Sequence, residues 1–152
     1  MTDKEIIEGN KLLAGFLGYQ LIQKKYQYLN YNSSNESYWE WDEGNIVCDK
    51  NGNEVNFYND EPLYSLEDIP FKSWDVLMPV VEKIENLSTN IESYYTEITS
   101  NGCKIIRFYS GNEAGTWQTG LYNKLSKIES TWYTCVVFVK WLNQNKENEI
   151  NS

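Results

Sequence analysis

The sequence predicts an α+β fold, in which an antiparallel sheet of about five or six strands packs against three helices. Three observations indicate this class. Segments 2–5 and 126–129 both have the capping-box form that starts a helix, a Ser or Thr followed three residues later by Glu. Asn-Gly pairs at 51–52 and 101–102 each separate strand-like runs, as in a β-hairpin. The chain of 152 residues, 41% of them hydrophobic, is long enough to bury a core.

The N-terminal part predicts one helix and one strand. Apolar residues recur at helical spacing over about residues 3–17, and Gly18 stands where a C-terminal cap is expected. Over residues 19–31 aromatic and aliphatic residues alternate with Gln, Lys and Asn, which predicts a half-solvated strand. Residues 32–35 then break the strand.

The next part predicts three short strands and a connection. We place the strands at about 37–42, 45–49 and 53–58, with the first Asn-Gly pair between the last two. The acidic segment 59–69 contains Pro62, so we expect it to be a surface connection.

A second helix is expected to start at Ser73, which would act as its N-cap. Pro79 removes the hydrogen bond to the carbonyl of Asp75, so the helix should either kink or begin regularly at Pro79. Its expected buried face consists of Trp74, Leu77, Met78, Val81 and Ile84.

A second hairpin is expected from residues 91–99 and 103–110, with Arg107 on its second strand. The Gly-rich segment 111–120 around Trp117 is then expected to be a loop.

The last helix should run to about Asn143, where we end the single domain at residues 1–143. Residues 144–152 form a polar tail that we expect to be disordered. The helix is apolar on most sides, so it is either central to the core or covered by a partner chain, and a homodimer is one alternative. Its expected stripe is Leu125, Ile128, Trp132, Cys135, Val136, Val139 and Leu142, widened by Tyr133, Val137, Phe138 and Trp141.

The charge disfavours two classes of partner. The net charge is −9, and Arg107 is the single arginine, whereas nucleic acids and anionic membranes reward Lys and Arg. No apolar run approaches the roughly 20 residues that cross a bilayer. Cys48, Cys103 and Cys135 stand in apolar contexts, as small buried hydrophobes do. We expect a soluble, cytoplasmic protein with neither nucleic-acid nor membrane binding.

Metal binding and catalysis both have plainer alternatives. Residues 49–54 resemble the start of a calcium loop, but Glu54 occupies the place of the required glycine, so we predict a hairpin. The chain has no histidine, which removes the commonest general base. We expect no metal, no cofactor and no catalytic residue. A hydrolase using carboxylates such as Glu82 or Glu113 is the remaining enzymatic alternative.

Five residues are candidates for binding a ligand or a partner: Trp39, Trp41, Arg107, Glu113 and Trp117. Trp39 and Trp41 are two positions apart on a strand, so they share one face, and Tyr38 and Glu40 must face the other way. Exposed Trp residues mark binding surfaces, although packing in the core is the plainer role.

Two blocks carry a resemblance, Lys72–Glu85 and the Lys127–Asn143 segment with its Val136–Asn143 run. Together with Asn10–Gly18 they resemble a group of short proteins encoded by bacteriophages and Bacteroidota. No activity is established for that group, so the resemblance implies no functional residues.

We therefore expect a small, non-enzymatic binding protein, such as a phage or mobile-element accessory factor that acts on a host protein. The alternative is a protein that binds or sequesters a small molecule, for instance a nucleotide, in an aromatic-lined pocket with Arg107 and Trp117 as contacts.

Overall fold

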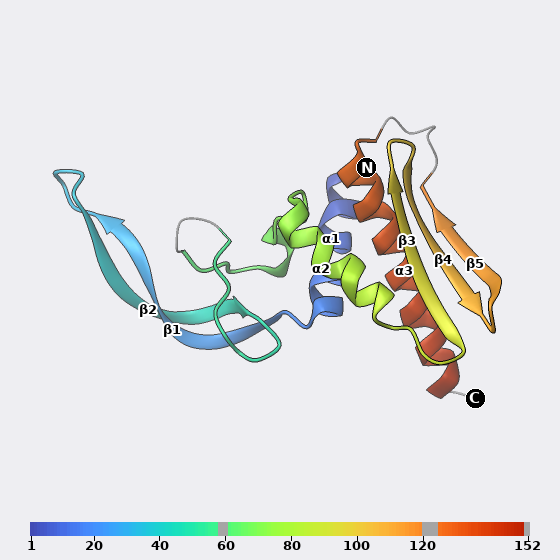
Figure 1. Ribbon diagram of the computed structural model, residues 1–152. Helices are drawn as coiled ribbons and strands as arrows, with labels where there is room; N and C mark the ends of the chain where they lie inside the picture. Colours follow the sequence, from blue (N-terminus) through green and yellow to red (C-terminus); the bar gives the residue numbers. More distant parts are fainter. Residues whose placement is uncertain (58–60, 120–124, 151–152) are drawn as a thin grey trace. The chain divides into compact units, whose positions relative to one another are not determined.

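The computed structural model describes residues 1–57, 61–119 and 125–150, and the chain divides into two compact units, residues 1–70 and 71–152. The predicted α+β class is confirmed, and the described residues form three α-helices and five antiparallel strands (Figure 1). The strands form two sheets, of two and three strands, where we expected one. The prediction of a single domain stays a prediction.

Unit 1 begins with α1 (Asp3–Leu17), whose predicted bounds and caps are confirmed. The Thr2 hydroxyl accepts the N–H of Glu5 at 3.3 Å, and the Glu5 carboxylate accepts the N–H of Thr2 at 2.7 Å. Gly18 ends the helix at a φ of 87°, a left-handed conformation that glycine adopts without a steric penalty.

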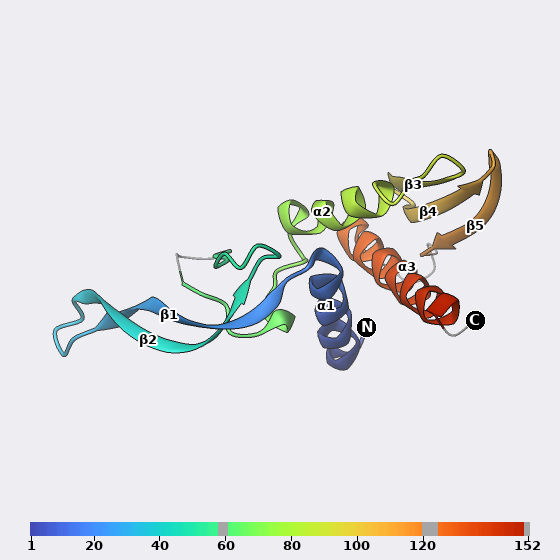
Figure 2. The ribbon, with the colours of Figure 1, turned by 90° about the horizontal axis from the view of Figure 1, so that it is seen from below.

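The β1 strand (Gln20–Tyr31) pairs along its whole length with β2 (Ser37–Cys48), and the two form a long twisted ribbon (Figures 1 and 2). The two strands predicted at 37–42 and 45–49 are therefore one. Their division was wrong because the ladder with β1 satisfies the backbone across Gly44, which lies opposite Lys24.

The strand predicted at 53–58 was also wrong over its described part, where only Glu54 forms a bridge, to Cys48. The Asp49 carboxylate instead accepts the N–H groups of Asn51 and Asn53, at 2.8 and 3.0 Å, and so closes the turn with its side chain. Residues 58–60 lie outside the described part.

The segment that follows is more than a surface connection, which corrects that prediction. It contains the short 3₁₀-helix η1 (Leu66–Asp68), and both Pro62 and Ile69 are buried. One hydrophobic cluster of this unit consists of the ribbon residues Tyr26, Ile46 and Cys48, with Ile22 and Tyr28 packed against them.

Unit 2 contains α2 (Trp74–Glu85), β3 (Glu92–Thr99), β4 (Gly102–Tyr109), β5 (Asn112–Gln118) and α3 (Lys127–Ile150). The sheet order is β3-β4-β5, so the second predicted hairpin is confirmed. The predicted loop over 111–120 was wrong for residues 112–118, because β4 supplies a pairing partner for this edge strand. Gly120 lies outside the described part. Helix α3 contacts all three strands, and α2 contacts β3 and α3.

Helix α2 begins at Trp74, so the alternative start at Pro79 was wrong, and Pro79 lies inside the helix. The expected buried face was wrong at Trp74, which is 37% exposed, and at Met78, which is only partly buried. The buried face keeps Leu77, Val81 and Ile84 and is completed by Val76 and Val80.

Helix α3 starts with the predicted capping box, in which the N–H of Ser126 donates to Glu129 at 2.8 Å. It runs to Ile150, so the predicted end at Asn143 was wrong, and residues 144–150 of the predicted disordered tail are helical. Trp132, Cys135, Val136, Phe138 and Val139 are buried as expected, whereas Tyr133 and Val137 are exposed. No helix of the described ranges has the length and apolar character that a membrane span needs.

Candidate functional site

The two faces of the β1–β2 ribbon differ in chemistry. On one face the Glu40 carboxylate accepts the hydroxyl of Tyr28 and, at 3.3 Å, the amide of Asn30. These bonds, together with one from Tyr38, stabilise the carboxylate and lower the pKa of Glu40. The same bond to Glu40 raises the pKa of Tyr28 to about 12. The polar side chains of this face therefore hydrogen-bond to one another.

The opposite face carries Trp39 and Trp41, so the predicted separation of these residues from Tyr38 and Glu40 is confirmed by the strand register. Trp39 lies opposite Leu29 and is 49% exposed, and Trp41 lies opposite Gln27 and is 67% exposed. The plainer expectation, that these two residues pack in the core, was therefore wrong. Both indoles are therefore largely open to solvent.

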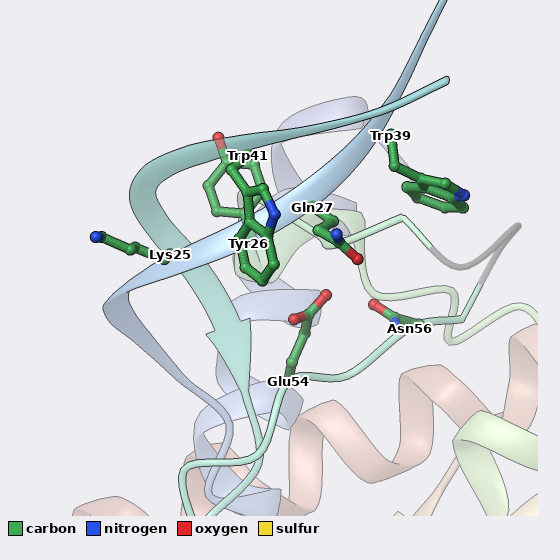
Figure 3. Close-up of a pocket in the computed structure, with 7 residues that line it drawn as sticks. All are labelled: Lys25, Tyr26, Gln27, Trp39, Trp41, Glu54 and Asn56. Carbon is green, nitrogen blue, oxygen red and sulfur yellow. The ribbon is translucent and has the colours of Figure 1, made fainter. Parts of the chain in front are cut away.

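A cavity of about 440 Å³ lies beside this pair (Figure 3). Strand β1 contributes one wall and β2 contributes the two Trp side chains, while Glu54 and Asn56 come from the chain after the Asn51-Gly52 turn. Figure 3 shows the side chains of Gln27, Glu54 and Asn56 gathered between the two indoles. The complete lining is Lys25, Tyr26, Gln27, Trp39, Trp41, Glu54 and Asn56.

Trp41 also borders a second hollow, of about 550 Å³, together with Lys25, Asp42 and Glu43. The two hollows share Lys25 and Trp41. Their combined charged groups are three carboxylates, of Asp42, Glu43 and Glu54, and the single amino group of Lys25. The surroundings of Trp41 are therefore negative.

The two units of the chain differ strongly in net charge. Residues 1–70 contain thirteen Asp and Glu residues and five Lys residues, which gives a net charge of −8. Residues 71–152 contain nine acidic and eight basic residues, which gives −1. Almost all of the negative charge thus belongs to the unit that carries the exposed Trp pair.

The other three candidates belong to unit 2. The guanidinium of Arg107 bonds to the Glu92 carboxylate and lies 5.6 Å from the Trp141 ring centre. Trp117 packs against Phe138 and Trp141, with ring centres 4.9 and 4.6 Å apart. Both residues therefore take part in the aromatic packing of this unit.

Glu113 is exposed on β5 and accepts the hydroxyl of Thr116 at 2.6 Å. Glu82, the other carboxylate considered for hydrolysis, is exposed on α2. Binding roles for Arg107, Glu113 and Trp117 stay predictions.

The Arg107–Glu92 pair gives a pH-dependent stability. Partial burial opposes ionisation of Glu92, but hydrogen bonds from Tyr94 and Arg107 outweigh it and lower the pKa of Glu92 below the ordinary value of 4.5. The pair therefore stabilises the fold fully above about pH 4.5, and this contribution is lost as the pH falls through the lowered pKa. We expect Glu92→Gln to destabilise the protein more at pH 7 than at pH 3, measured by urea unfolding at both values. An equal loss at the two pH values would contradict this assignment.

Sequence reasoning missed four lining residues with polar side chains, Lys25, Gln27, Glu54 and Asn56. The alternation along β1 could have placed Lys25 and Gln27 on the face of the Trp pair. Gln27 lies opposite Trp41, and Lys25 is two positions from Gln27 on the same strand, so both side chains share that face. No local signal could have placed Glu54 and Asn56 there, since their position depends on how the chain returns after the turn.

Comparison of the chain with protein-family models, with curated proteins and with solved structures gives no match. The function is therefore argued from the side chains of the site.

Proposed function

We propose that this protein is a non-enzymatic binding protein that holds another protein through the Trp39–Trp41 face of the β1–β2 ribbon. The observation that carries the proposal is the exposure of 49% and 67% for two neighbouring Trp side chains. Trp is one of the residue types enriched among the few residues that dominate the energy of protein interfaces. An indole combines a large apolar surface with one N–H donor and loses little conformational entropy on binding.

The extent of the surface favours a macromolecular partner. Tyr31, at the far end of β1 and on the same face, is 59% exposed, so aromatic surface continues beyond the cavity along the ribbon. Several exposed aromatic side chains on one face are typical of an interaction site. In line with the expectation from the sequence, the partner would be a protein of the cell in which this chain is made.

A small-molecule ligand is the second candidate, and the cavity is the observation that favours it. Its volume of about 440 Å³ falls in the range of ligand sites, which is roughly 300–1,000 Å³. Such a ligand would fill the cavity and leave the outer faces of the two indoles free.

The test compares Trp41→Ala with the unchanged protein. We expect the partner's dissociation constant to rise by about 30-fold or more, because a central Trp typically contributes about 2 kcal/mol or more to binding. The melting temperature should barely change, since 67% of the side chain is already exposed. The partner is first identified by affinity capture and mass spectrometry, and its binding is then measured by calorimetry.

Tyr95→Ala is the matched control, because Tyr95 is a 55% exposed aromatic residue on β3, in the other unit. It should leave binding unchanged. Equal binding by the Trp41→Ala protein would contradict the proposal, and so would a loss of binding by Tyr95→Ala alone.

A further inference from the structure

We propose that the partner inserts a cationic side chain, Lys or Arg from a basic segment, into the cavity bordered by Trp39, Trp41 and Glu54. This inference rests on the proposed function and specifies the chemistry of the partner. Three features of unit 1 support it: the aromatic walls, the carboxylates beside them and the charge of the whole unit.

The aromatic walls favour a cation. The face of an indole is the best of the aromatic side chains at attracting an ammonium or guanidinium group, which gains about 0.5–2 kcal/mol according to its desolvation. Trp39 and Trp41 stand two residues apart on one strand face, a spacing of about 7 Å. A cation between them can approach both rings, while its alkyl chain covers apolar indole surface.

The carboxylates determine the sign of the charge. Glu54 lines the same cavity as the two indoles, and Asp42 and Glu43 lie with Trp41 around the neighbouring hollow. An apolar side chain in this place would remove water from Glu54 without compensating its charge, which is unfavourable. An anionic group would be repelled by all three carboxylates. A cationic side chain is attracted by the faces of the two indoles and also compensates the charge of Glu54.

Lys25 also lines the cavity, and its positive charge would repel a cationic side chain. The position of Lys25 weakens this repulsion. It lies opposite Glu43 across the two strands, so its charge has an acidic neighbour. In Figure 3 its amino group points away from Glu54 and Asn56. The cavity side of the site is thus dominated by the carboxylate of Glu54.

The negative net charge of unit 1 favours a partner that is basic as a whole. A surface with a net charge of −8 over residues 1–70 attracts a basic protein and accelerates its association, an effect that salt weakens. A basic segment with several Lys or Arg residues would meet this field before its central side chain enters the cavity.

The test uses the full chain labelled with ¹⁵N and three nine-residue probe peptides of otherwise identical Gly-Ser sequence. The peptides carry three Lys, three Arg or three norleucine residues, and norleucine keeps an alkyl chain but lacks the charge. The six indole N–H signals are observed by NMR, and those of Trp39 and Trp41 are assigned with Trp39→Phe and Trp41→Phe. We expect the Lys or the Arg peptide to shift these two signals in a saturable, salt-sensitive way, and the norleucine peptide to shift neither.

Three variants locate the contact. Glu54→Gln should weaken binding of the basic peptide by about tenfold, and Lys25→Ala should strengthen it. Glu8→Gln, the matched control, removes the same charge from α1, where Glu8 is 58% exposed, and should change binding less than twofold. Equal losses in Glu8→Gln and Glu54→Gln would show a diffuse charge effect and overturn the cavity as the site.

The outcomes separate the two proposals. Shifts of Trp39 and Trp41 that are equal for the norleucine and the basic peptides, or absent for all three, would overturn the cationic occupant. If capture of a cellular partner still depended on Trp41, the proposed function would stand without it. Capture that is independent of Trp41 would overturn the proposed function itself.

Discussion

Replacing Phe138 with alanine should lower the free energy of unfolding by about 3–5 kcal/mol. Phe138 has no exposed surface in α3, and its ring lies 5.3, 4.9 and 5.7 Å from the ring centres of Tyr94, Trp117 and Trp141. Truncation would remove buried apolar surface and leave a cavity that three large rings cannot easily fill. Urea unfolding followed by far-UV circular dichroism measures the loss, because Trp fluorescence would change with the ring contacts themselves.

Val137→Ala is the matched control on the same turn of α3. Val137 is 38% exposed, so its truncation should change the free energy of unfolding by no more than about 0.5 kcal/mol. A loss below about 1 kcal/mol for Phe138→Ala would contradict the placement of α3 in the core of unit 2. The same expectation follows from the sequence for Trp132, which is 7% exposed.

Features with a local cause could be predicted from the sequence. The starts of α1 and α3 depend on a hydroxyl and a carboxylate three residues apart, and both capping boxes form as expected. The end of α1 is a left-handed glycine cap at Gly18, whose N–H donates to the carbonyls of Ala14 and Gly15. The β3–β4 hairpin follows from two strand-like runs around one Gly-containing turn, which again involves only neighbours.

Features that depend on distant partners could not be predicted. The composition of residues 112–118 favours a loop, and only the pairing with β4 makes it a strand. The spacing in α2 identified a stripe but not which of two adjacent stripes faces the interior, so Trp74 was expected inside. Val76 and Val80 are buried in place of Trp74 and Met78, and only tertiary packing determines this choice.

The candidate site shows the same division. Alternation along β2 places Trp39 and Trp41 on one face, and the register confirms it. Their exposure depends on whether another layer covers the ribbon, which no local pattern contains. The cavity itself needs Glu54 and Asn56 to return beside the strands, so its acidic character emerged only from the structure.

Replacing Gly102 with alanine should destabilise the protein by more than about 2 kcal/mol, for two separate reasons. Its φ of 119° is a conformation that side-chain-bearing residues rarely adopt. An added Cβ would also stand 2.9 Å from the carbonyl oxygen of Thr119, closer than such atoms normally approach. The backbone of Thr119 can move little, because its N–H donates to the carbonyl of Cys103 at 3.2 Å and its hydroxyl to the carbonyl of Ser130 at 2.9 Å.

Gly111→Ala separates these two reasons. Gly111 also has a positive φ, of 81°, but nothing lies within 4 Å of the added Cβ, so this change should cost only the conformational term of about 1–2 kcal/mol. The difference between the two variants, measured by urea unfolding, therefore reports the clash with Thr119. Equal losses would show that the end of β5 yields to a methyl group, and the close packing of Gly102 against Thr119 would then contribute nothing to the stability of unit 2.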